Sequence, residues 1–202
     1  YVAFLAKLYS SPERGLYEEV PVITWLEEHH VEATQSYMLA LGLSGLIAFL
    51  ANVDIYYRFV NDSVLFSIGS TCLVVGLIAI VMQAYTLNPA GEKFDPDLRD
   101  AHNAWVVVFA AGFLTAMLVY TRTSWKRGHI PYSRSFLFAT ALLGAGLYAG
   151  MYHYRHERAG FLTAAAVGQN LLLMSSLLFY TSTVRELADP TLAYGTPLLP
   201  VR

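Results

Sequence analysis

Five long apolar stretches follow one another along the chain, separated by short polar segments. They cover residues 32–51, 62–87, 102–121, 133–152 and 160–183. Each is close to the length of about 20 residues that a helix needs to cross the ~30 Å hydrocarbon core of a bilayer. The stretches are too long for strands and lack a strict alternation of apolar and polar positions. The pattern therefore predicts an all-α integral membrane protein with five transmembrane helices in an antiparallel bundle.

The segments on either side of this predicted bundle, residues 32–183, have a different composition. Residues 1–31 are amphiphilic and interrupted by Pro12 and Pro21, which predicts an interfacial N-terminal segment that lies on the membrane surface. Residues 184–202 are rich in proline, which predicts an extended C-terminal tail able to reach over a partner.

The overall composition supports a membrane location and excludes several function classes. Hydrophobic residues make up 55% of the chain and charged residues only 14%, whereas soluble domains carry about 25% charged residues. The net charge of −2 argues against a nucleic-acid partner. Cys72 is the single cysteine, so neither a disulfide framework nor a thiolate metal cluster is expected.

The distribution of basic residues predicts an orientation in the membrane. Five crossings place the two termini on opposite sides. The predicted loop at 122–134 holds four Lys or Arg residues and no acidic residue, and such loops face the cytoplasm. We therefore expect a multi-pass protein of the bacterial inner membrane, with a periplasmic N-terminus and a cytoplasmic C-terminus.

The predicted topology places five of the six histidines at the periplasmic face, and only His129 at the other. These five are His29 and His30 before the first helix, His102 at the start of the third, and His153 and His156 at the end of the fourth. Glu28 and Glu32 share one helical face with His29, because their spacing keeps them within about 120°.

Imidazole and carboxylate groups at one level suit a haem iron or another metal ion. The candidate cofactor-binding residues are His29, His30, His102, His153 and His156, together with Arg155 and Arg158, which would pair with haem propionates. The candidate metal ligands are Glu28, Glu32, His102 and His156. Three alternatives stay open: haem b, non-haem iron or copper, and no cofactor, since membrane helix ends routinely carry His, Arg and Tyr at the headgroup level.

Two further groups of residues lie within the predicted helices. Gln169 and Asn170 lie deep in the fifth, where they either form hydrogen bonds between helices or contact a quinone or pigment. Gly144, Gly146 and Gly150 in the fourth predict close packing against a neighbouring helix.

Short motifs in the first four helices give the chain a family resemblance. "EEHH" and "DAHNAW" each open a helix, and "GLYAGMYHYRHERAG" ends a hairpin, so one hairpin looks as if it were used twice. The chain resembles an uncharacterised bacterial family of four-helix membrane proteins over about residues 27–160. Gly146, Gly150, Tyr154 and His156 match a family motif, whereas Ala149 and Glu157 replace glycines in it. The resemblance implies redox work at the periplasmic face, with a c-type cytochrome as a partner. No catalytic activity is established for the family, so no catalytic residue carries over from it.

Together these patterns lead to a leading hypothesis and an alternative. The leading one is a small integral membrane subunit of a respiratory or photosynthetic electron-transfer complex, which contacts the lipid bilayer and other membrane subunits and holds haem b or a metal near the periplasmic face. The alternative is a cofactor-free structural subunit of a larger membrane complex. No Ser/His/Asp set, phosphate loop or catalytic acid pair stands out, so a non-catalytic role is expected. The turn at 149–160 is predicted to cover the histidine cluster, with His156 folded back toward His102.

Overall fold

A computed structural model describes residues 31–60, 62–87, 95–126, 132–153 and 159–188. These residues form helices joined by short connections, and no strand occurs among them. In chain order the helices are α3 (Val31–Ala51), α4 (Val53–Val60), α5 (Ser63–Tyr85), α6 (Pro96–Lys126), α7 (Tyr132–His153) and α8 (Ala159–Ala188). The predicted all-α class is therefore confirmed.

Three of the helices are long and apolar enough to cross a membrane. They cover Val31–Ala51 in α3, Ser63–Tyr85 in α5 and Pro96–Trp125 in α6. The finding supports a membrane-embedded protein. The helices α7 and α8 have 22 and 30 residues, and their crossing of the bilayer stays a prediction.

The helix α6 begins earlier than the apolar pattern indicates. The predicted helix starts at His102, whereas α6 starts at Pro96. Asp95 explains the difference, because its Oδ1 accepts hydrogen bonds from the backbone N–H groups of Asp97 (3.0 Å) and Leu98 (3.4 Å) and so caps the helix. Proline suits the first helical position because it needs no backbone donor there. His102 consequently lies in the second turn of α6.

The short helix α4 was not predicted, since the sequence between residues 52 and 62 reads as a polar connection. Tyr56 and Val60 are four residues apart and both are buried, at 4% and 5% exposure, whereas Tyr57 is exposed. This spacing gives α4 one face that packs against the other helices. The connection therefore folds because two of its side chains reach the core.

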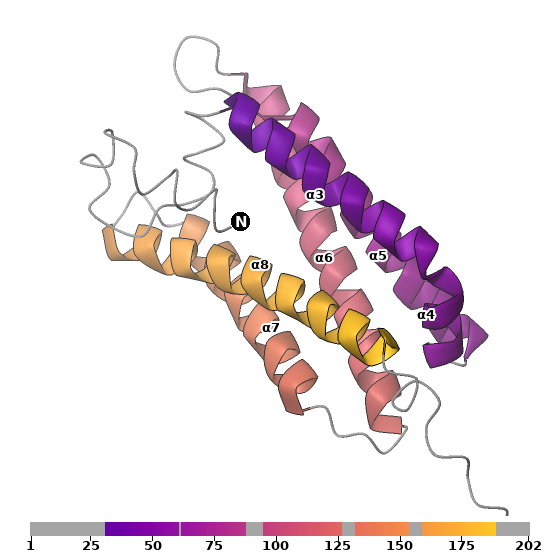
Figure 1. The fold of residues 1–202 in the computed structure, drawn as a ribbon. Helices are drawn as coiled ribbons and strands as arrows, with labels where there is room; N and C mark the ends of the chain where they lie inside the picture. The colour runs from indigo at the N-terminus through magenta and orange to yellow at the C-terminus, as the bar shows by residue number, and fades with distance from the viewer. Residues whose placement is uncertain (1–30, 61, 88–94, 127–131, 154–158, 189–202) are drawn as a thin grey trace, which may run out of the picture.

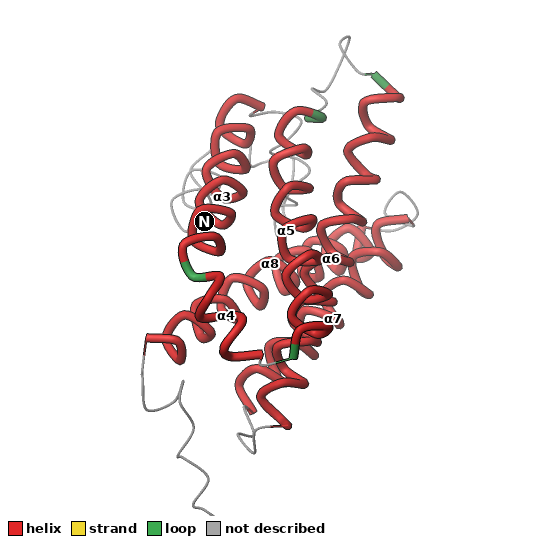
Figure 2. Tube along the Cα trace, turned by 90° about the vertical axis from the view of Figure 1, so that its right-hand side faces the viewer, coloured by secondary structure: helices red, strands yellow, loops and turns green. Residues whose placement is uncertain are grey.

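The long helices alternate in direction and form two groups (Figure 1). α5 packs closely against α3 and α6, and α7 packs closely against α8, while the contact between these two groups is much smaller. Figure 2 shows α5 between α3 and α6. We call α3, α5 and α6 the three-helix layer, and α7 with α8 the hairpin.

Glycines allow two of the helix pairs to approach closely. A Cβ atom built on Gly112 of α6 would lie 2.6 Å from the Cys72 carbonyl oxygen and 3.0 Å from the Gly76 nitrogen of α5. A Cβ atom on Gly144 of α7 would lie 2.6 Å from the Gly168 carbonyl oxygen of α8. No larger side chain fits at these crossings without moving a backbone, which is how small residues act in membrane helix pairs.

The other two glycines of α7 behave differently from the prediction. Gly146 and Gly150 are exposed, and no atom of the described helices lies within 4 Å of a Cβ atom built on either. The expectation that all three glycines pack against a neighbouring helix of this chain is right for Gly144 and wrong for these two. They lie on a face of α7 that no described helix covers.

Large apolar side chains cover the outside of the structure as well as its core. Leu73, Met117 and Phe179 are at most 2% exposed, whereas Ile47 is 68% and Val107 67% exposed. Such outward-facing residues would be unfavourable in water, but they match the hydrocarbon of a bilayer. The burial pattern agrees with a membrane location.

The two glycines on opposite faces of α7 make a direct test of the hairpin crossing. Gly144→Leu is expected to destabilise the protein by about 1–3 kcal/mol or more, because the new side chain must displace the α8 backbone. Gly146→Leu, the matched control, is expected to leave stability unchanged or raise it by up to about 1 kcal/mol through helix propensity. Thermal unfolding in detergent, followed by circular dichroism, measures both. Equal losses in the two variants would show that the crossing does not depend on Gly144.

Candidate functional site

The structure describes a small part of the predicted cofactor site. His102 is buried on α6, Glu32 is exposed on the first turn of α3, and the backbone of His153 ends α7. The remaining candidates lie outside the described residues: Glu28, His29, His30, Arg155, His156 and Arg158. The turn predicted to cover the histidines, with its motif residue Tyr154, lies largely outside them too.

His102 is held against the end of α5. It is 9% exposed, and its Nδ1 lies 3.4 Å from the Thr86 hydroxyl oxygen, just beyond the last turn of α5. On the same side of α5, Gln83 donates from its Nε2 atom to the Trp105 carbonyl oxygen of α6 at 3.4 Å. These two contacts tie the C-terminal end of α5 to the N-terminal part of α6, and they fix the position of the His102 ring.

The Thr86 hydroxyl oxygen lies within hydrogen-bonding distance of three groups: the carbonyl oxygens of Met82 (3.1 Å) and Gln83 (3.3 Å) and Nδ1 of His102 (3.4 Å). The hydroxyl has one hydrogen. When it donates to a carbonyl oxygen, the contact with His102 is made by a proton on Nδ1, and the lone pair is on Nε2; when it donates to Nδ1, the proton is on Nε2. Metal-binding histidines commonly use the first arrangement, in which one ring nitrogen donates to an outer group and the other binds the metal.

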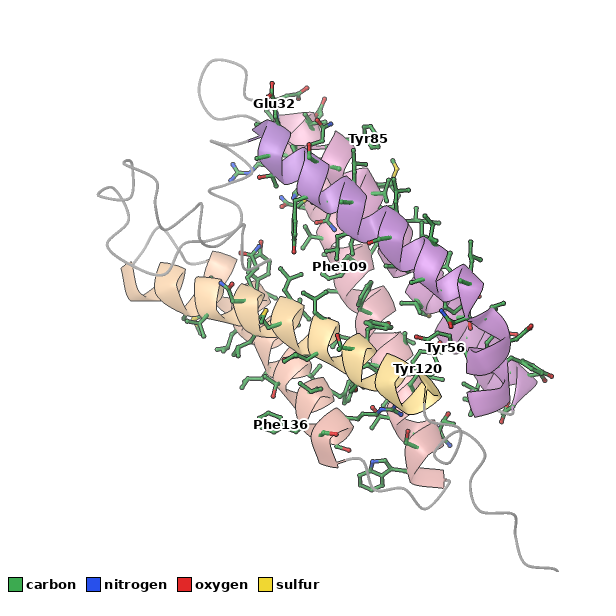
Figure 3. The ribbon with its side chains drawn as sticks, viewed as in Figure 1. Glu32, Tyr56, Tyr85, Phe109, Tyr120 and Phe136 are labelled. Carbon is green, nitrogen blue, oxygen red and sulfur yellow. The ribbon has the colours of Figure 1, made fainter. Side chains whose placement is uncertain are left out.

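The described residues do not form a complete metal site around His102. Within it, no three His, Cys, Asp or Glu side chains are grouped so that they could hold a metal ion. Glu32 lies at the end of the bundle where α6 begins (Figure 3), but its side chain is exposed. A site at this end would therefore take His102 as one ligand and complete its set from the histidines that precede α3 or follow α7.

The end of α7 and the start of α8 lie away from the ends at which α3 and α6 begin (Figures 1 and 2). Residues 29 and 30 directly precede α3, and α3 begins at the same end of the bundle as α6 (Figure 1). Chain connectivity thus favours His29 or His30 over His156 as a second imidazole beside His102.

A buried cation at the opposite end of α6 was not recognised in the sequence. Arg134, at the start of α7, is 0% exposed, and its Nη1 donates to the Ser124 hydroxyl oxygen of α6 at 2.6 Å. Ser124 in turn donates to the Tyr120 carbonyl oxygen at 3.1 Å. The guanidinium carbon also lies 5.9 Å from the centre of the Phe179 ring of α8, within the range of a cation–π contact. Arg134 therefore links α6, α7 and α8.

The same cation acts on the phenol of Tyr56 in α4. Burial raises the pKa of Tyr56 above its ordinary value, and the positive charge of Arg134 opposes that rise. The rings of Tyr56 and Tyr120 are in contact, with centres 5.5 Å apart and planes tilted by 45°, and Figure 3 shows these two labelled residues close together where α8 meets α4. The end of the bundle near α4 is consequently rich in aromatic and polar groups.

An apolar cavity of about 320 Å³ lies between α8 and the three-helix layer. Aliphatic side chains of α3, α5 and α8 form most of its wall, together with the rings of Phe49, Tyr56, Phe109, Phe113 and Tyr180. The Tyr180 hydroxyl is buried, and no described atom forms a hydrogen bond with it. An unsatisfied buried hydroxyl costs about 1–3 kcal/mol, so this end of the cavity has an unused donor.

Gln169 and Asn170, the deep polar residues singled out in the sequence, are half-buried on α8 and do not line this cavity. The residues that do line it carried no signal in the sequence, because isolated Tyr and Phe residues are common in membrane helices. The role of Arg134 does not follow from the sequence either, because Arg134 counts as one more basic residue of a predicted loop until its burial is known.

Comparisons with known proteins give no relative for this chain. No family model matches it, and no significant match is found among curated proteins or among solved structures. The resemblance to the four-helix bacterial family therefore stays a prediction, and the function must be argued from the residues themselves.

The buried pair of Arg134 and Ser124 allows a stability test. Ser124→Ala is expected to cost about 1.5–3 kcal/mol, the usual contribution of a hydrogen bond to a charged group. Ser135→Ala removes a neutral, exposed hydrogen bond from the Trp125 indole (3.0 Å) and is expected to cost less than about 1 kcal/mol. Thermal unfolding of both variants in the same detergent measures the difference. A smaller effect at Ser124 than at Ser135 would show that this contact does not stabilise the bundle.

Proposed function

We propose that the chain is a small integral membrane subunit of an electron-transfer complex, in which His102 would bind the iron of a b-type haem, or non-haem iron or copper. A haem held there would supply one-electron chemistry. The observation that carries the proposal is the buried imidazole of His102, whose Nδ1 lies 3.4 Å from the Thr86 hydroxyl oxygen. In the proposed tautomer Nδ1 carries the proton and Nε2 has the lone pair that would bind the metal. A buried ionisable group in a membrane helix costs free energy, so its presence suggests a function.

The second ligand in this proposal comes from residues at the same end of the bundle. His29 or His30 is the first choice, because each adjoins the start of α3; His156 is the second choice, with His153 in reserve. Arg155 and Arg158 would pair with haem propionates, and Glu28 and Glu32 are carboxylate candidates for a metal.

The proposed orientation follows from the four Lys and Arg residues at 122–134, where α6 ends and α7 begins; Arg122 and Lys126 belong to α6 and Arg134 to α7. That end of the bundle faces the cytoplasm of a bacterial inner membrane, all five long helices cross the bilayer, and the His102 end faces the periplasm. A c-type cytochrome is the proposed partner there, as the resemblance to the four-helix family implies.

The alternative function is a cofactor-free structural subunit, and the exposed face of α7 favours it. Gly146 and Gly150 are four residues apart on that face, and no described atom approaches a Cβ built on either. A glycine pair of this spacing lets another membrane helix approach closely. Such a surface is useful to a subunit that holds a larger membrane complex together.

The two functions are separated by the oxidised and dithionite-reduced absorption spectra of the purified protein, with iron and copper analysis. The proposal predicts a Soret band that shifts on reduction, or stoichiometric metal. His102→Ala should abolish either signal, while His129→Ala, at the opposite face of the predicted topology, should leave it unchanged. A protein that is folded by circular dichroism but has neither haem nor metal would contradict the proposal and favour the structural role.

Variants of Thr86 test whether His102 acts as a ligand. Thr86→Val keeps the shape of the side chain but removes the outer contact to His102, and is expected to weaken cofactor affinity about 10- to 100-fold. Thr86→Ser keeps the hydroxyl and should retain most of the affinity. Equal affinities in these two variants, measured by cofactor titration, would show that Thr86 does not position the ring.

A further inference from the structure

The cavity between α8 and the three-helix layer is long and changes in character along its length. Its wall on α3 runs from Leu41 to Phe49, which corresponds to about 12 Å at ~1.5 Å per residue, and Asn52 extends it just beyond the end of α3. Leu41, Ile80 and Leu173 mark the apolar end, whereas Asn52, Tyr56 and Tyr180 line the other. The polar end lies beside α4, the helix to which Tyr56 belongs (Figure 3). A ligand that fits this space is elongated, with a polar group at one end.

The hydrogen-bonding groups in the wall define what that polar group must be. Ser176 and Ser44 donate to the carbonyl oxygens of their own helices, at 2.8 and 3.2 Å. Tyr180 is different, because its buried hydroxyl forms no hydrogen bond with any described residue. Asn52, also at the polar end, donates from its amide nitrogen to the Ala48 carbonyl oxygen at 2.8 Å. The polar end therefore has a phenol and an amide as hydrogen-bond donors, and the natural partner of either is an acceptor such as a carbonyl oxygen.

The charge and shape of the cavity wall limit the possible ligands further. No residue in the wall of the cavity carries a charge, so a neutral headgroup is favoured over the charged headgroup of a phospholipid. Aromatic rings surround the polar end: Tyr180 meets Phe113 edge to face, with centres 5.3 Å apart, and Tyr56 lies 5.5 Å from Phe49. Flat rings pack well against such a wall.

We propose that this cavity binds an isoprenoid quinone. The headgroup lies at the polar end, where one of its carbonyl oxygens accepts a hydrogen bond from Tyr180, and the isoprenoid tail extends along α3 toward Leu41 and Ile80. The cavity volume of about 320 Å³ agrees with such a ligand, because small-molecule sites start at about 300 Å³ and the tail can continue into the bilayer. Neither His102 nor Thr86 lines the cavity, so the inference does not depend on the function proposed for His102.

The test is the binding of decylbenzoquinone, a short-tailed quinone, to the purified full chain in detergent, measured by isothermal titration calorimetry. Saturable binding to one site is expected. Tyr180→Phe, which keeps the ring and removes the donor, should weaken binding about 2- to 12-fold, the equivalent of one hydrogen bond. Tyr57→Phe is the matched control, because Tyr57 is exposed, lies on the neighbouring position to Tyr56 and is not part of the wall; it should bind like the wild type.

A second pair of variants tests the position of the ligand. Ala48 lines the cavity at its exposed edge, so Ala48→Phe should fill the space and weaken binding at least tenfold. Ile47→Phe adds a ring on the outward face next to it and should have no effect. Circular dichroism checks that each variant is folded. If Ala48→Phe does not fold, Tyr180→Phe still tests the proposal.

Three results would overturn the proposal. The first is the absence of saturable binding by the wild type. The second is equal binding by all four variants, which would indicate partition of the quinone into the detergent micelle. The third is displacement of the quinone by diheptanoyl phosphatidylcholine at equal concentration, which would assign the cavity to a phospholipid chain.

Discussion

The close approach of helix backbones at glycine is the constraint on which the rest of the structure depends. Helices in lipid gain little from burying apolar surface, so their association relies on tight packing and hydrogen bonds. Gly112 brings α6 against Gly76 of α5, and Gly144 brings α7 against Gly168 of α8. Between these two pairs the contact is made by side chains instead, as where Phe113 meets Tyr180 and the Ser176 hydroxyl lies 3.8 Å from the Met117 sulfur. Large side chains hold the hairpin away from the three-helix layer, and the cavity is the space that results.

Polar contacts at the two ends of α6 complete this arrangement. His102 meets Thr86 of the α5 terminus at one end, and Arg134 of α7 meets Ser124 at the other. Polar groups at these positions are costly unless another helix supplies a partner, so each contact fixes which helices are neighbours. The glycines determine how closely the helices pack, and the polar contacts determine their register. α6 takes part in both, which makes it the central element of the fold and explains why both proposed sites adjoin it.

Much of this architecture can be predicted from the sequence, because long apolar stretches leave few alternatives to helices. The limits of α3 and α5 agree with the apolar pattern to within a few residues. The early start of α6 depends on the cap formed by Asp95, and α4 depends on the burial of Tyr56 and Val60, which a local pattern of this length does not reveal. The same distinction between local patterns and contacts applies to the candidate site. His102 stands out as an imidazole at a helix end, whereas the roles of Arg134 and Tyr180 arise from contacts between distant segments, which a single sequence does not contain.

The central claim is that the long helices lie within a bilayer, with the outward-facing apolar residues in contact with lipid. Spin labels placed singly at Ile47, Val107, Leu142 and Leu178, in a Cys72→Ala background, test it in reconstituted vesicles. These four residues are between 50% and 68% exposed and belong to α3, α6, α7 and α8. Power-saturation electron paramagnetic resonance compares the access of oxygen, which concentrates in the bilayer, with that of a water-soluble nickel chelate. The account predicts that oxygen dominates at all four positions. Dominant access of the nickel chelate at Leu142 and Leu178 would contradict the crossing of the bilayer by α7 and α8, and the same result at all four positions would contradict the membrane location itself.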